Sequence, residues 1–115
     1  MARLRTDIWI GALIRRVQAE GAFATILKKG SAEAGAIFLV VNGLDCLNDL
    51  YSPAPQSFLM DDDSSERRFS KVLSEGGTEE ISSRLESEKR FDPDLWIVEI
   101  EDKQRRPFVS VVPSE

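Results

Sequence analysis

The sequence predicts an α+β fold: a mainly antiparallel sheet of five or six strands, one amphipathic N-terminal helix packed on a face of the sheet, and a second, looser helix. Two observations lead to this prediction. An uninterrupted apolar run, residues 36–41, is rich in β-branched and aromatic side chains and is typical of a strand covered on both faces. Ahead of it, apolar residues recur at helical spacing, which indicates a helix that can cover the sheet.

The N-terminal segment predicts the first helix. Thr6 stands at the N-cap position, Asp7 favours the positive end of the helix dipole, and Gly21 stands where a C′ glycine would end the helix. The apolar stripe is formed by Ile10, Leu13, Ile14 and Val17, with Trp9 at its border. The opposite face is polar, so this helix is expected to bury one side against the sheet.

Three strands are expected next, as an antiparallel meander in sequence order. Gly30 and Gly35 bracket the first connection, because glycine suits loops in which φ turns positive. Asn42-Gly43 predicts a type I′ hairpin turn after the central apolar run. The two outer strands of this meander are residues 22–29 and residues 44–52.

The middle of the chain predicts shorter elements around an acidic loop. Prolines at positions 53 and 55 end the third strand, and short strands are expected at residues 57–60 and 69–73. Between them lies the loop 61–66, which begins with Asp61, Asp62 and Asp63. Adjacent aspartates can hold a divalent cation, but the spacing of a calcium loop is absent, so a solvated hairpin tip is the alternative.

The last third predicts a helix and two strands. Thr78 caps the helix, Asp92-Pro93-Asp94 ends it, and its apolar edge is limited to Ile81, Leu85 and Phe91. The pairs Glu80/Arg84 and Glu86/Arg90 have the favourable i,i+4 order. Residues 95–102 then alternate, with Trp96, Val98 and Ile100 on one face. A polar turn, residues 103–106, leads to an edge strand at residues 107–112.

Composition limits the classes of function. The length of 115 residues and the 42% hydrophobic content suit one soluble domain, residues 1–115. The single cysteine, Cys46, cannot form an intramolecular disulfide and is expected to be an inert packing thiol in a cytoplasmic protein. No histidine is present, which removes the commonest general base and metal ligand. The apolar run at residues 8–14 is too short to span a membrane.

Carboxylates in the second half offer few catalytic arrangements. Pro93-Asp94 followed by Glu101-Asp102-Lys103 resembles the pattern of a class of metal-dependent nucleases, but both acids fall on one predicted strand, about 20 Å apart. Glu99 and Glu101 point the same way from that strand, which suits either acid–base chemistry or a solvated strand face. No catalytic residue, metal ligand or cofactor site is assigned on this basis.

A small basic patch is the candidate partner-binding site. Its members are Arg15 and Arg16 on the first helix and Lys28 and Lys29 at the end of the first strand. The alternative is an ordinary solvated surface on which the long side chains lie along apolar neighbours. Because the net charge is −5, extensive nucleic-acid binding is not expected, and an RNA contact through these four residues is a minor alternative.

The best functional hypothesis from the residues is a small cytoplasmic protein-interaction module that binds an unknown protein partner or forms a homodimer. It depends on the missing catalytic constellations and on a predicted sheet with more apolar surface than two short helices cover. The alternative is a metal-assisted hydrolase that uses carboxylates of the acidic second half.

The chain also resembles an uncharacterised, mainly alphaproteobacterial family, the domain of unknown function 1491. The residues that carry the resemblance are Leu4-Arg5-Thr6-Asp7-Ile8-Trp9 through Arg15-Arg16, Gly30 through Ile37, and Arg90-Phe91-Asp92-Pro93-Asp94-Leu95-Trp96. Together they span nearly the whole chain, which implies a single family domain. No activity or site residue carries over. The turn at residues 103–106 lacks the glycine expected in such a hairpin, which puts its geometry in doubt.

Overall fold

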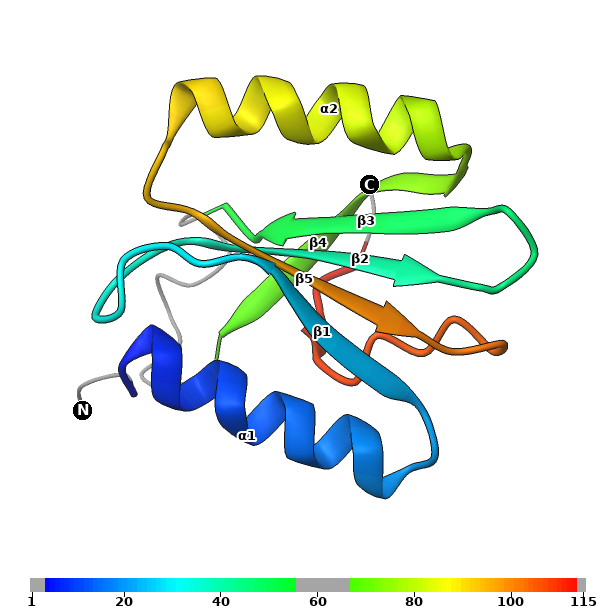
Figure 1. Ribbon diagram of the computed structural model, residues 1–115, viewed down its shortest axis with the longest axis horizontal. Helices are drawn as coiled ribbons and strands as arrows, with labels where there is room; N and C mark the ends of the chain where they lie inside the picture. Colours follow the sequence, from blue (N-terminus) through cyan, green and yellow to red (C-terminus); the bar gives the residue numbers. More distant parts are fainter. Residues whose placement is uncertain (1–3, 56–66, 114–115) are drawn as a thin grey trace.

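A computed structural model describes residues 4–55 and 67–113 of the chain. Within these residues it contains two helices and six strands (Figure 1). In chain order they are α1 (Thr6–Ala19), β1 (Phe23–Lys28), β2 (Ile37–Asn42), β3 (Asn48–Pro53), β4 (Arg68–Gly76), α2 (Thr78–Phe91), β5 (Trp96–Glu101) and β6 (Ser110–Val111). The strand predicted at 57–60 and the acidic loop at 61–66 lie outside the described residues.

The α+β class is confirmed, but the sheet is mixed. Its order is β1-β5-β2-β3-β4-β6. The pairs β1–β5, β2–β3 and β3–β4 are antiparallel, and the pairs β2–β5 and β4–β6 are parallel. The prediction of a mainly antiparallel sheet is therefore wrong, and so is the meander, because β5 lies between β1 and β2.

The insertion of β5 has a physical reason. A strand that is apolar on both faces belongs in the centre of a sheet, where both of its edges are paired. β2 is such a strand, and it pairs with β5 from Ile37↔Trp96 to Asn42↔Glu101. A parallel partner requires a long crossover connection, which β3, β4 and α2 supply.

The two helices cover opposite faces of the sheet (Figure 1). On one face Ile10, Leu13 and Val17 of α1 form the larger core cluster with alternate residues of β2 and β5. On the other face α2 contributes Ile81 and Leu85 to a smaller cluster. The expected face of β5 is confirmed, since Trp96, Val98 and Ile100 all belong to the cluster under α1.

Gly30 and Gly35 are required for close backbone approach rather than for a positive φ. A Cβ on Gly30 would lie 2.0 Å from the carbonyl oxygen of Asp94, and one on Gly35 would lie 2.7 Å from the same atom. The loop between β1 and β2 therefore crosses directly over the start of β5. The described residues give a positive φ to only one glycine, Gly21.

The turn after β2 is not the predicted two-residue hairpin. β3 begins at Asn48, and the loop 43–47 is closed by a bond from the Gly43 amide to the Leu47 carbonyl (3.0 Å). Positive φ values fall on Leu44 and Cys46. Asn42 supports this loop by accepting a hydrogen bond from the Leu44 amide on its side-chain oxygen (2.8 Å), a local use of asparagine that competes with a type I′ turn.

Helix α1 ends as predicted and begins differently. Gly21 has a φ of +86°, its amide bonds the Gln18 carbonyl, and the Ala22 amide bonds the Val17 carbonyl, which is the Schellman arrangement. Thr6 is the first helical residue and not the N-cap. It is buried, and its hydroxyl donates to the carbonyl of Gly35 (3.0 Å), which ties the helix start to the β1–β2 loop.

Helix α2 is less buried than α1. Its predicted ion pairs, Glu80/Arg84 and Glu86/Arg90, are replaced by Arg84–Glu88 (2.9 Å) and Glu86–Lys89 (2.6 Å). Phe91 does not extend the apolar edge, because 90% of it is exposed. Of the edge strand expected at residues 107–112, the structure forms only β6.

Candidate functional site

A groove of about 550 Å³ lies between α1 and the segment that precedes β6. Its lining residues are Leu4, Trp9, Ala12, Arg16, Arg67, Pro107, Phe108, Val109 and Ser110. We call this feature the Trp9 groove. It combines two arginines with two aromatic side chains, and none of its lining residues within the described ranges is a carboxylate.

Trp9 and Arg67 form one side of the groove. The Trp9 ring packs at a tilted angle on Phe69, with the ring centroids 5.7 Å apart. The Arg67 guanidinium lies 6.0 Å from the centroid of the Trp9 ring. Its Nη2 donates to the carbonyl of Leu4 (3.0 Å) and to the hydroxyl of Thr6 (3.1 Å). These contacts fix a cation beside the indole before any ligand binds.

The opposite side is held in place by a turn after β5. Asp102 accepts hydrogen bonds from the backbone amide (2.8 Å), Nε (2.9 Å) and Nη2 (3.0 Å) of Arg106. The side-chain bond from Arg106 lowers the pKa of Asp102 from its ordinary value, although burial acts in the opposite direction. The Arg106 guanidinium in turn lies 4.9 Å from the Phe108 ring centroid. Arg16 closes the arrangement, because its Nη2 donates to the Phe108 carbonyl (2.8 Å).

The chemistry of the Trp9 groove suits binding. Arginine and tryptophan are enriched at positions that dominate protein–protein affinity, since they combine a large apolar area with donors for anions. Arg16 is exposed and uses Nη2 for the bond to Phe108, while a guanidinium carries five N–H donors. A ligand that offers carboxylates and an apolar side chain therefore matches the lining.

The basic residues predicted as a partner site are Arg15, Arg16, Lys28 and Lys29, and of these the Trp9 groove includes Arg16. Lys28 has a different role: its Nζ donates to the carbonyls of Pro93 (2.7 Å) and Leu95 (3.0 Å) and stabilises the start of β5. The chain reverses between α1 and β1, so the end of β1 lies beside the start of α1. Arg15 and Arg16 are in the second half of α1.

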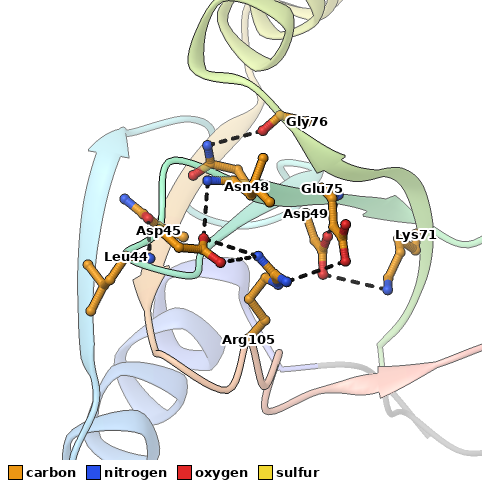
Figure 2. Close-up of polar contacts among 10 residues, drawn as sticks. Leu44, Asp45, Asn48, Asp49, Lys71, Glu75, Gly76 and Arg105 are labelled. Carbon is orange, nitrogen blue, oxygen red and sulfur yellow. Dashed lines mark hydrogen bonds and ion pairs between the residues drawn. The ribbon is translucent and has the colours of Figure 1, made fainter.

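A second polar cluster gathers where the loop 43–47, the end of β4 and the turn after β5 meet (Figure 2). Arg105 is at its centre, with Nη1 3.2 Å from both carboxylate oxygens of Asp45 and Nη2 3.4 Å from Glu75. Beside it Asp49, which is buried, accepts from the Glu75 amide (2.8 Å) and pairs with Lys71 (3.5 Å). Because its carboxylates are partnered, this cluster is best explained as a clamp that holds three loops together.

Backbone conformation supports the clamp interpretation. Leu44, Cys46, Glu75 and Arg105 all have positive φ values, between 53° and 71°. Such values are uncommon for residues other than glycine and persist where surrounding contacts fix them. A Cβ on Gly43 would lie 2.8 Å from Nη1 of Arg105, so the glycine of the predicted hairpin makes room for this side chain.

The remaining sequence candidates lie apart from the groove. Asp94 precedes β5 and Glu101 ends it, while Glu99 accepts a hydrogen bond from Asn42 (3.4 Å). In the described ranges, 4–55 and 67–113, no three Cys, Asp or Glu side chains are grouped so that they could hold a metal ion. Residues Asp61 to Asp63 lie outside those ranges.

Cys46 is exposed, so its predicted packing role is wrong. The reason is that the loop 43–47 replaces the first part of the expected third strand. Neither helix is long and apolar enough to cross a bilayer, as far as the described residues go.

Sequence reasoning missed Trp9, Arg67 and Phe108 as site residues. A weak signal was present for Phe108, because Arg106 stands two positions before it. In an extended chain, residues i and i+2 share a face, so this pattern predicts a cation beside a ring. The signal could not show that Trp9 and Arg67 lie at the same groove, since both are far from Phe108 in the sequence.

Comparison with known proteins gives consistent similarities. The sequence pattern of the family described as protein of unknown function (DUF1491) matches residues 4–110. The solution structure of protein Atu0922 from A. tumefaciens is 46% identical, with a TM-score of 0.84 and coverage of 98% of each chain. A crystal structure of a DUF1491 family protein from Caulobacter crescentus CB15 is 35% identical, with a TM-score of 0.78 and coverage of 96% of this chain and 98% of that one. No curated protein matches the chain.

Proposed function

The chain belongs to the DUF1491 family of proteins of unknown function, and we propose that it is a protein-binding module that takes up an acidic peptide segment of a partner protein in the Trp9 groove. One observation carries this proposal. The groove places the arginines Arg16 and Arg67 around the exposed part of Trp9.

Charge and shape support a peptide as the ligand. Carboxylates bind guanidinium groups with charge-assisted hydrogen bonds, and an apolar side chain can pack on the indole and the Phe108 ring. The groove lies between α1 and the segment that precedes β6, and its volume of about 550 Å³ can take a short peptide segment. The net charge of −5 disfavours a nucleic acid, so the attraction is local to the groove.

We also propose the wider setting in which this module works. It acts as a single domain, residues 1–115, in the cytoplasm, because one cysteine allows no internal disulfide. α1 is the firmly packed helix and α2 the looser one, which is supported by the larger number of buried side chains on α1. Among the basic residues predicted as a binding site, Arg16 is the one that binds the peptide.

The test is a selection of peptides followed by a matched pair of charge reversals. Peptides are selected on the wild-type protein from a random displayed library, and their affinities are measured by fluorescence anisotropy. We expect acidic peptides with at least one aromatic or aliphatic residue, and affinities that fall as salt is raised. Arg16→Glu should weaken them by about 10-fold or more, since it replaces an attraction by a repulsion at the groove.

Arg15→Glu is the control. It makes the same charge change at the neighbouring position, which does not line the groove. Its affinity is expected to stay within about 2-fold of wild type, because an exposed charge outside the contact is screened. Equal losses in Arg15→Glu and Arg16→Glu, or selected peptides without acidic residues, would contradict the proposed function.

A further inference from the structure

We propose that β1 is the contact surface for a second copy of this chain, and that the two β1 strands pair in antiparallel orientation and join the two sheets into one. β1 is an edge strand of six residues, whereas the opposite edge of the sheet is β6, with two. An open edge presents a row of backbone donors and acceptors that can pair with another strand.

β1 also carries an apolar strip that the helices leave uncovered. Phe23 is 67% exposed and Leu27 is 53% exposed, with Thr25 between them, also exposed. These residues lie on the α2 side of the sheet, since Phe23 and Thr25 pair with Glu101 and Glu99, and Leu27 lines a small cavity with residues of α2. α2 itself packs on β3 and β4. The strip is therefore continuous with the open edge.

The first part of β1 carries few of the features that prevent pairing at an edge. Natural edge strands commonly carry lysine or proline that keeps other strands away. Residues 23–27 contain neither, and no charge. Lys28 could prevent pairing in this way, but its amine donates hydrogen bonds to the carbonyls of Pro93 and Leu95 of the same chain. One irregularity is present, a shift in the β1–β5 register between Ile26 and Lys28, and it limits regular pairing to the residues before it.

That limit selects a register that is complementary to itself. In a two-fold pairing centred on Ala24, Phe23 stands opposite Thr25 of the second copy and diagonal to its Leu27. Aromatic and β-branched side chains that face each other across antiparallel strands stabilise the pair. On the other face Ala24 and Ile26 already pack against the α1 cluster, so the pairing does not disturb the core.

Charge at the two ends of β1 favours the same antiparallel orientation. Glu20 precedes the strand and Lys29 follows it, and both are exposed. Antiparallel pairing brings the acidic end of β1 in one copy towards the basic end of β1 in the other, and this happens twice. Glu20 also lies 3.7 Å from Arg106, so the second copy extends an existing charge pair. A parallel pairing would instead place like charges together, which is unfavourable.

The oligomeric state of the full chain tests the proposal. Light scattering after size exclusion, over a concentration series, should give twice the chain mass of 12.9 kDa. Phe23→Glu should raise the dimer dissociation constant by about 30-fold or more, because it places a charge in the centre of the contact. Phe91→Glu is the matched control, since Phe91 is also exposed but stands at the end of α2, and it should leave the constant within about 2-fold of wild type.

Two results would overturn the proposal: a wild-type protein that remains a monomer at about 1 mM, or a dimer that Phe23→Glu leaves intact. The first would leave the edge open for a strand of a different protein. Peptide binding is tested through Arg16, which lies on α1 outside β1, and its readout is peptide affinity rather than chain mass, so the failure of either proposal is distinguishable from failure of the other.

A disulfide measurement tests the register separately. Ala24→Cys, made in a Cys46→Ser background, places two cysteines across the axis with Cα atoms about 4.5–5.5 Å apart, which is within the range for a disulfide. Mild oxidation should therefore link the copies covalently. Ser82→Cys on the exposed face of α2, in the same background, should remain monomeric on a denaturing gel. If Ala24→Cys does not cross-link, the register centred on Ala24 is wrong.

Discussion

Gly30→Ala is the sharpest test of the strand order. The added Cβ would lie 2.0 Å from the carbonyl oxygen of Asp94 and 2.6 Å from both the carbonyl carbon and the oxygen of Leu95. Such atoms essentially never come closer than 3.0 Å, and all three belong to the backbone, so no side chain can rotate away. The loop must move away from the start of β5 by about 1 Å, which is the gap between these distances.

The magnitude follows from what that movement disrupts. Overpacking a tight contact costs about 1–3 kcal/mol. The same movement strains the hydrogen bond from the Ser31 amide to the Asp94 carbonyl (2.9 Å), which contributes about 0.5–1.5 kcal/mol. We therefore expect Gly30→Ala to lower the free energy of unfolding by about 3 kcal/mol, a large part of the total for a domain of this size.

Gly11→Ala is the control for this substitution. Gly11 lies within α1, and an added Cβ would meet only Nη1 of Arg15, at 3.9 Å. Alanine is the better helix former, so Gly11→Ala should raise stability by about 1 kcal/mol. Urea unfolding followed by tryptophan fluorescence measures both variants. If Gly30→Ala is within about 0.5 kcal/mol of wild type, β5 does not run beneath this loop and the strand order is refuted.

Three further substitutions or titrations probe the core and the groove. Burial and, to a smaller extent, the negative charge of Asp49 raise the pKa of Tyr51 to about 12. Because the chain has one tyrosine, its phenolate absorbance should rise at about that pH in the folded protein and near pH 10 in denaturant. Since the pKa of Tyr51 is higher in the folded state than in the unfolded state, the stability that the neutral phenol contributes is complete below pH 10 and is lost as the pH rises towards 12. Titration of the folded protein at pH 10 would contradict this account. Asp102 has a lowered pKa, so the stability that its carboxylate contributes is present above pH 3.8, its ordinary pKa, and is lost as the pH falls below that value. Asp102→Asn should therefore be less stable than wild type at neutral pH, and the difference should shrink in acid. A difference in urea unfolding that does not change with pH would refute this account. Thr6→Val keeps the shape but removes the donor to the Gly35 carbonyl and the acceptor for Arg67, so it should cost about 1–3 kcal/mol. Unchanged thermal unfolding would show that these two bonds contribute nothing.

The elements could be predicted from the sequence because their signals are local. The stripe of α1 and the alternation of β5 place their apolar residues on one face, and the structure buries those residues. The end of α1 could also be predicted, because it depends on one glycine, Gly21, at the position after the helix. Each of these depends on neighbours within about one helical turn or a few strand residues, where side-chain geometry is fixed by the backbone.

The strand order and the groove depend on contacts between distant segments. In the sequence Gly30 and Gly35 suggest turn residues, because a glycine required by a close backbone looks the same as one required by a positive φ. Asn42 similarly supports a longer loop through its side chain. Trp9 and Phe108 meet at the groove only after β5 has been placed, so no local pattern identified them as one site.

The place of β5 also determines the order in which the molecule can assemble. Ile37 must find Trp96, half the chain away, before the centre of the sheet exists. During synthesis, one edge of β2 therefore remains unpaired until residues 96–101 have left the ribosome. Contacts between such distant residues slow folding, and an exposed apolar strand can associate with other chains in the meantime. Low temperature weakens the association of exposed apolar surfaces and should therefore favour the folded product over aggregates.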